Sequence, residues 1–108
     1  MAAKTLPAPV KRAMSQLGDD LATWRRLRNL TVAQVAERAD VARGVVVKLE
    51  AGGGTTFESV LRVARALGVL DSLATSLDPY RTDVGRLRSE EVLPQRVRHR
   101  AIPKPDEP

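Results

Sequence analysis

The outward face of one short predicted helix carries the chemistry that this chain offers most clearly. Val46 and Leu49 continue the apolar spacing of a helix over residues 42–50 and therefore face inward. The same geometry turns four residues outward: Arg43, Gly44, Val47 and Lys48. An arginine can donate two hydrogen bonds to guanine, a lysine can donate to a base or a phosphate, and a valine can contact a thymine methyl group. We therefore predict that these four residues contact base edges of double-stranded DNA; the alternative is an ordinary solvated face.

A second short helix is expected directly before this one, joined to it by a tight turn. Thr31 and Gln34 have the spacing of a capping box, which predicts a helix over residues 32–39. Asp40 follows, and aspartate is among the few residues besides glycine that tolerate a left-handed turn. Two helices joined in this way form a helix-turn-helix, which lays its second helix in the major groove of DNA.

A long apolar stripe precedes this pair of helices. Its spacing predicts helical structure from about Pro9 to Asn29, with these inward residues: Val10, Met14, Leu17, Leu21, Trp24 and Leu27. Gly18 lies inside the stripe and predicts that the core helix starts again near residue 18. Trp24 is expected to pack in the core.

Two further helices are expected after the helix-turn-helix. Thr55 and Glu58 have capping-box spacing and predict the start of a fourth helix, which Gly68 ends. A short fifth helix is expected over residues 69–77, before Asp78-Pro79. The fold class expected is therefore all-α: a compact five-helix domain with flexible tails.

The domain organisation follows from where the periodicity begins and fades. We expect an N-terminal arm over residues 1–9 and a DNA-binding helix-turn-helix domain over residues 10–79. A basic, largely disordered C-terminal tail is expected over residues 80–108, apart from a short helix around residues 84–91. Within the tail, the basic cluster of Arg96, Arg98 and Arg100 is expected to give a second DNA contact or a protein-docking segment; the alternative is weak nonspecific attraction.

Composition narrows the classes of function. The chain has 108 residues and a formal net charge of +5, which suits a polyanionic partner such as DNA or RNA. It has no cysteine, and no segment approaches the roughly 18 consecutive apolar residues of a membrane span. The first residues lack the apolar core of a secretory signal. We therefore expect a cytoplasmic location and no membrane partner.

Catalytic and metal chemistry have little support. The single histidine, His99, has no nucleophile or acid at a recognisable spacing. Adjacent carboxylates such as Asp19-Asp20 and Glu90-Glu91 diverge on a helix and cannot act as an acid/base pair. We expect no enzyme, no cofactor and no metal site.

Taken together, these motifs resemble the Xre family of helix-turn-helix proteins, which are similar to the lambda repressor and Cro. The resemblance covers residues 18–77 and rests on these stretches: Leu30-Thr31, Val35-Ala36-Glu37-Arg38-Ala39, Val41-Ala42-Arg43, Lys48-Leu49-Glu50 and Val60-Leu61-Arg62-Val63-Ala64-Arg65-Ala66-Leu67-Gly68. It implies a five-helix fold and a transcriptional repressor of its own promoter, which we expect to act as a homodimer on a pseudo-palindromic operator. The Gly-Thr-Thr-Phe and Leu-Pro-Gln-Arg-Val-Arg-His-Arg stretches also resemble HipB-type antitoxins.

Three positions depart from the family pattern. Val32 stands where the family usually has a glutamine that contacts a phosphate, and Asp40 replaces the usual turn glycine. Ala42 replaces a Ser, Thr or Asp helix cap, a change that costs ~1 kcal/mol of helix stability. These departures bear on the strength of DNA binding and leave the fold unchanged.

The remaining DNA and dimer contacts are expected outside the recognition helix. Contacts to the DNA backbone are predicted for Thr31, Gln34, Thr55, Thr56 and Arg28. For the cations that end the first helix, Arg25, Arg26 and Arg28, the alternative is stabilisation of the helix dipole. A basic arm carrying Lys4, Lys11 and Arg12 could reach a minor groove. The dimer surface is predicted at Leu70, Leu73 and Leu77, with core packing as the alternative.

Two alternative functions remain open from the sequence. The chain could be an antitoxin that neutralises a toxin protein and binds DNA to regulate its own operon. It could also be an adaptor on the same fold that bridges proteins or binds RNA. Substituting Arg43 and Lys48 separates the DNA-binding function from the adaptor.

Overall fold

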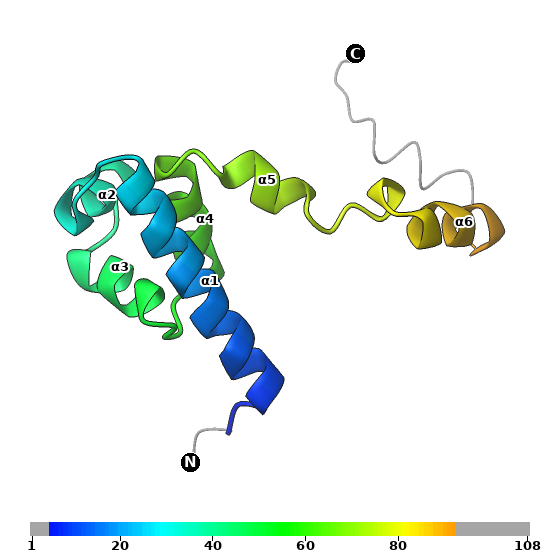
Figure 1. Cartoon of the computed structure of the whole chain (residues 1–108), viewed down its shortest axis with the longest axis horizontal. Helices are drawn as coiled ribbons and strands as arrows, with labels where there is room; N and C mark the ends of the chain where they lie inside the picture. Colours follow the sequence, from blue (N-terminus) through cyan, green and yellow to red (C-terminus); the bar gives the residue numbers. More distant parts are fainter. Residues whose placement is uncertain (1–4, 93–108) are drawn as a thin grey trace. The chain divides into compact units, whose positions relative to one another are not determined.

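The computed structural model describes residues 5–92, and within that range the chain contains helices and no strand. Figure 1 shows their order, with these bounds: α1 Ala8–Leu27, α2 Val32–Ala39, α3 Arg43–Glu50, α4 Phe57–Ala66, α5 Leu70–Thr75, the 3-10 helix η1 Pro79–Arg81, and α6 Asp83–Val92. The chain divides into two units after Ala74. The division precedes the domain end expected at residue 79, and each unit is described by itself below.

Helix α1 is one continuous helix, so the predicted restart near residue 18 is wrong. It begins at Ala8, inside the segment expected as an N-terminal arm. Gly18 serves a different purpose: a Cβ atom there would lie 2.5 Å from the carbonyl oxygen of Leu49 and 2.9 Å from that of Glu50. Glycine is therefore required because α1 crosses the last turn of α3 at backbone distance.

The helix-turn-helix forms as the sequence predicts. The Thr31 hydroxyl accepts a hydrogen bond from the Gln34 backbone N–H at 3.1 Å, and the Gln34 side-chain oxygen accepts from the Thr31 N–H at 2.8 Å. Asp40 ends α2 in the left-handed conformation, with φ 57° and ψ 49°. Helix α3 then begins after Ala42, which offers no side-chain cap. The predicted capping box and turn residue are confirmed.

Helix α4 begins one residue later than its predicted capping box requires. Thr56, and not Thr55, is the N-cap, and its hydroxyl accepts a hydrogen bond from the Ser59 N–H at 3.1 Å. The predicted pairing of Thr55 with Glu58 is therefore wrong. Glu58 instead lies in the first turn of α4 and forms an ion pair with Arg62 at 2.9 Å.

The core of the first unit lies where α2, α3 and α4 meet. Its largest fully buried side chains are Val35, Val46, Val63 and Leu67. Branched aliphatic residues fill this space without an aromatic ring. Trp24 does not belong to the buried core, contrary to expectation, because 39% of it is exposed. The Arg28 guanidinium lies over its ring, 5.1 Å from the centroid.

The second unit begins with short helices and not with a disordered tail. The helix expected around residues 84–91 is present as α6, and it follows η1 directly. The Thr82 hydroxyl accepts a hydrogen bond from the Gly85 N–H at 2.9 Å, and Arg86 donates to the Tyr80 carbonyl oxygen at 2.9 Å. The structure thus adds η1 to the helix that was expected within this tail.

Candidate nucleic-acid interface

Helix α3 presents the four residues predicted to contact bases on one exposed side. Val46 and Leu49 are buried, as predicted, and the opposite side carries Arg43, Gly44, Val47 and Lys48, which we call the α3 face. Val47 is 57% exposed. A Cβ atom added to Gly44 would meet no other atom within 4 Å, so the surface there is open. An approaching ligand thus meets an unobstructed helix side.

The two cations of the α3 face are available to an external anion. Neither Arg43 nor Lys48 forms an ion pair with any residue in the described range 5–92. Their charges therefore have to be balanced by solvent ions or by a bound polyanion. A protein cation that neutralises a DNA phosphate releases a cation condensed on the DNA, and this release contributes a large share of the affinity in protein–DNA association.

The last turn of α3 is anchored to α1 by an ion pair that our sequence reasoning did not anticipate. Two guanidinium nitrogens of Arg25 donate to the Glu50 carboxylate at 2.7 and 3.1 Å, and the third nitrogen donates to the Leu30 carbonyl oxygen at 3.1 Å. Both side chains are only 16% exposed. The hydrogen bond to Glu50 raises the pKa of Arg25, since it favours the charged form.

This ion pair shows which of the roles expected for Arg25 its side chain can have. The sequence offered helix-dipole stabilisation or a phosphate contact for it, whereas its donors are used within the protein. Arg25 and Glu50 are separated by 25 positions, and no local spacing rule links residues so far apart. The pair fixes the orientation of α3, and with it the α3 face.

Thr31 and Gln34 lie at the N-terminus of α2, where each already serves the capping box. The Gln34 side-chain oxygen is bound to the Thr31 N–H, which leaves its NH2 group as the part that can donate to a phosphate. The Thr31 hydroxyl oxygen accepts from Gln34, so its own hydrogen remains a donor. Both side chains are held in one orientation before any DNA arrives.

The loop between α3 and α4 lies directly beside Lys48. A Cβ atom on Gly53 would lie 2.6 Å from Lys48 Cγ, so glycine leaves room for the lysine side chain to run across the loop. Gly52 adopts a φ of +83°, which favours glycine. Thr55 and Thr56 follow at once, and Thr56 caps α4. The predicted backbone contacts at the start of α4 are therefore close in the chain to the α3 face.

Arg28 lies at the C-terminal end of α4 and contacts Leu67 there. Its Nε atom donates to the Leu67 carbonyl oxygen at 3.0 Å, and its guanidinium lies against Gly68 and the Trp24 ring. It thus stabilises the C-terminal end of α4. The structure does not bring Arg28 together with the α3 face, although the sequence grouped it with the DNA-backbone contacts.

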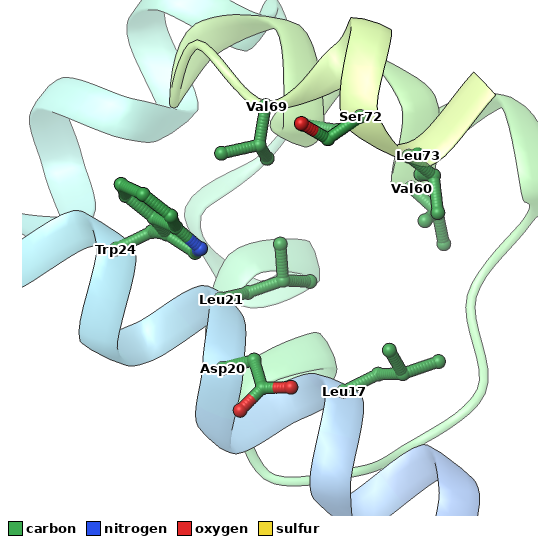
Figure 2. A pocket seen from close by; sticks show the side chains of 9 residues that line it. Leu17, Asp20, Leu21, Trp24, Val60, Val69, Ser72 and Leu73 are labelled. Atoms are coloured by element: carbon green, nitrogen blue, oxygen red, sulfur yellow. The ribbon is translucent and has the colours of Figure 1, made fainter. Parts of the chain in front are cut away.

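The three leucines predicted as a dimer surface differ in burial and are divided between the two units. Leu73 lines an apolar pocket of about 250 Å³ between α1, α4 and α5, together with Leu17, Leu21 and Trp24. Figure 2 shows these side chains pointing toward one another across the pocket. Leu70 is half-buried, and Leu77 lies beyond α5 in the second unit with 89% of its surface exposed.

Other expectations concern residues or sites outside this region. Arg96, Arg98 and Arg100 lie outside the described residues. Within residues 5–92, no cluster of histidine, aspartate or glutamate side chains is arranged to hold a metal ion. No helix in the described range is long and apolar enough to cross a membrane.

Comparison with known proteins supports this geometry. Residues 21–70 match the model of the helix-turn-helix family HTH_3, a family of DNA-binding regulators. The match begins in the half of α1 that packs on the core and ends at the first residue of α5. Neither a curated protein nor a solved structure matched the chain. With two helices, a left-handed turn at Asp40 and an exposed second helix, residues 21–70 form an Xre-like helix-turn-helix domain of this family.

Proposed function

We propose that this protein is a sequence-specific DNA-binding transcriptional repressor that inserts α3 into the major groove. The observation that carries the proposal is the α3 face: two cations that form no ion pair with any of residues 5–92, flanking an open glycine and an exposed valine. Arg43 is suited to a guanine and Val47 to a thymine methyl group. Thr31, Gln34, Thr55 and Thr56 would hold the phosphates on either side.

We further propose that the protein acts as a homodimer in the cytoplasm. One helix offers a small interface, and two helices on a pseudo-palindromic site would supply the affinity and specificity that one lacks. The dimer surface proposed here is that of Leu70, Leu73 and Leu77, of which the first two are half-buried and Leu77 is 89% exposed. Repression of its own promoter is the simplest regulatory circuit for such a protein.

The proposal is tested by selecting duplexes from a random DNA library with the full-length protein. We expect a half-site to be enriched and the wild-type protein to bind it more tightly than a scrambled duplex. Arg43→Ala and Lys48→Ala should each lower the preference for the selected duplex by about 5- to 160-fold, because a good base contact contributes about 1–3 kcal/mol of discrimination.

Arg65→Ala is the matched control for Arg43→Ala. Arg65 is an exposed arginine in the last turn of α4, on the side of that helix away from Val63 and Leu67. Its loss should leave the preference unchanged. If no duplex is enriched, or if the Arg43 and Lys48 variants bind as the wild type does, the DNA-reading function is wrong. The antitoxin and adaptor hypotheses would then be tested by searching for a protein or RNA partner.

A further inference from the structure

We propose that the first turns of α1 add a second contact with the DNA backbone, made by Lys11 and Arg12 on phosphates next to those held by the α3–α4 loop. This inference rests on the proposed function and assigns to α1 a role that its membership of the helical core does not require. It also replaces the flexible basic arm expected from the sequence, because both residues lie within the helix Ala8–Leu27.

One line of residues on α1 faces α3 and its following loop. Arg25 binds Glu50, and Gly18 lies against the carbonyl oxygen of Leu49. Farther toward the N-terminus, a Cβ atom on Gly52 would lie 3.1 Å from Ser15 Cα. Successive members of this line thus contact α3 from its last turn to the loop that follows it.

Lys11 and Arg12 continue this line beyond the end of α3. They precede Ser15 by four and three positions, and residues at these separations are neighbours on a helix surface. Figure 1 shows the N-terminal part of α1 projecting past the loop between α3 and α4. The two cations therefore lie about one helical turn, or about 5.4 Å along the axis, from the residue that touches the loop.

The loop connects these cations with the α3 face. Gly52 contacts Ser15 on one side, and its neighbour Gly53 contacts the side chain of Lys48 on the other. A basic path thus runs from Lys48 across the two glycines to Lys11 and Arg12. Neither glycine could carry a side chain without displacing Ser15 or Lys48.

The chemistry of this path suits a row of phosphates. Lys11 and Arg12 are exposed, and neither forms an ion pair with a residue in the range 5–92. Phosphates of one DNA strand recur every ~3.4 Å along the duplex axis. If the α3–α4 loop and the start of α4 contact the DNA backbone, the next phosphates of that strand therefore lie within reach of Lys11 and Arg12, which are about one helical turn from the loop. A base contact is not expected, since this path lies beyond the end of α3.

The test is a salt series of binding by the full-length protein to the duplex selected above. The double variant Lys11→Ala/Arg12→Ala should reduce the slope of log K against log salt by ~1.8, because each lost phosphate contact contributes ~0.9. Between 50 and 200 mM salt, the variant should consequently lose about tenfold less affinity than the wild type. The same reduction is expected on a scrambled duplex, since phosphates carry no sequence information.

Two controls make the result specific. Arg65→Ala removes an exposed arginine from α4 and should leave the slope unchanged. Ethylation of single phosphates should identify positions that weaken the wild type and no longer affect the double variant, and these should adjoin the positions sensitive to Thr55→Ala and Thr56→Ala. Because alanine favours a helix, both variants should keep the far-ultraviolet circular dichroism spectrum of the wild type.

The outcomes separate this inference from the proposed function. A double variant with an unchanged salt slope and unchanged phosphate pattern would overturn the α1 contact, while a loss of specificity in Arg43→Ala would keep the repressor function. Failure of the Arg43 and Lys48 variants to alter binding would overturn the function itself, whatever Lys11 and Arg12 do.

Discussion

At the scale of single residues, the structure depends on a few close contacts between α1 and α3. The guanidinium of Arg25 satisfies both oxygens of Glu50 and the Leu30 carbonyl at once, and Gly18 allows the two helices to approach. Both features hold the last turn of α3 close to α1. A change at either residue should therefore alter stability even though neither belongs to the α3 face.

We predict that Arg25→Ala lowers the free energy of unfolding by about 1–3 kcal/mol, because it leaves a largely buried carboxylate and a carbonyl without their donors. Urea denaturation followed by circular dichroism measures this change. Arg26→Ala is the matched control, since Arg26 is exposed and forms no ion pair within residues 5–92. Equal stability of the Arg25 variant and the wild type would show that the ion pair contributes no net free energy.

The pKa of Arg25 also predicts how this contribution depends on pH. The hydrogen bond to Glu50 raises it above its ordinary value, so the stabilisation is fully present below the unfolded-state pKa and is lost only as the pH rises through the folded-state value. From the Arg25 side, the difference in stability between wild type and Arg25→Ala should remain constant from about pH 6 to pH 9. A decline within that window would contradict the assignment.

A pair of glycine substitutions should have opposite effects. Gly18→Ala places a Cβ atom 2.5 Å from the Leu49 carbonyl oxygen, and overpacking of this kind costs about 1–3 kcal/mol. Gly44→Ala meets open space within α3 and should stabilise the protein by about 0.5–1 kcal/mol, since alanine favours a helix. Thermal unfolding of the two variants beside the wild type measures both effects. A stabilising Gly18 variant would mean that α1 and α3 do not cross at this distance.

At the scale of elements, α3 is the proposed recognition helix, and it begins without a side-chain cap. Thr31 and Thr56 cap α2 and α4 with their hydroxyls, whereas Ala42 gives α3 no side-chain cap. The backbone at Ala42 is extended, with φ −69° and ψ 149°, as in a capping residue. The backbone at this position thus has the conformation of a capping residue, but alanine has no side-chain oxygen to accept the hydrogen bond.

Ala42→Ser should therefore stabilise the protein by about 0.5–1.5 kcal/mol through a new hydrogen bond to the first turn of α3. The increase is measured by denaturation in urea. Ala33→Ser places the same side chain at an exposed position of α2 that needs no cap, and should give no gain. If both serines act alike, the effect does not come from capping.

Elements whose signals are local were predictable from the sequence. The range of α2 and the left-handed turn at Asp40 follow from adjacent residues, and both were confirmed. The continuity of α1 was not predictable, because the reason for Gly18 is a contact with Leu49, far along the chain. The cap of α4 was misplaced by one residue since Thr55 and Thr56 are both suitable, and only the folded chain decides between them.

The same distinction applies to the candidate site. Burial of Val46 and Leu49 follows from helical spacing, so the exposure of Arg43, Gly44, Val47 and Lys48 followed as well. The engagement of Arg28 by Leu67 and the inward direction of Leu73 depend on how helices pack, which spacing does not specify. Direct contacts with DNA remain predictions for all of these residues.

At the scale of the whole molecule, the buried apolar core found among residues 5–92 lies in the first unit. The cluster of buried residues extends from Leu30 to Leu67, and the side chains packed around it extend no farther than Val69. The described part of the second unit instead exposes apolar residues of α6, among them Val84 and Leu87. The second unit should therefore contribute little to the free energy of unfolding of the first.

We predict that truncation after Asp78 leaves the free energy of unfolding within about 0.5 kcal/mol of that of the full chain, because only surface outside the core is removed. Urea denaturation followed by circular dichroism at 222 nm measures this free energy for both proteins. The truncated chain retains Arg43, Lys48, Lys11 and Arg12, so its salt slope on the selected duplex also shows whether later residues contact DNA. A large loss of stability would show that the second unit supports the first.

The position of the single tryptophan provides an intrinsic optical reporter. Trp24 lines a pocket formed by α1, α4 and α5, and the α3 face lies outside that pocket. Its emission should therefore follow unfolding while remaining insensitive to bound DNA itself. Melting curves recorded by this fluorescence at increasing duplex concentration would then give the binding free energy through its linkage to stability, without any label on the protein or the nucleic acid.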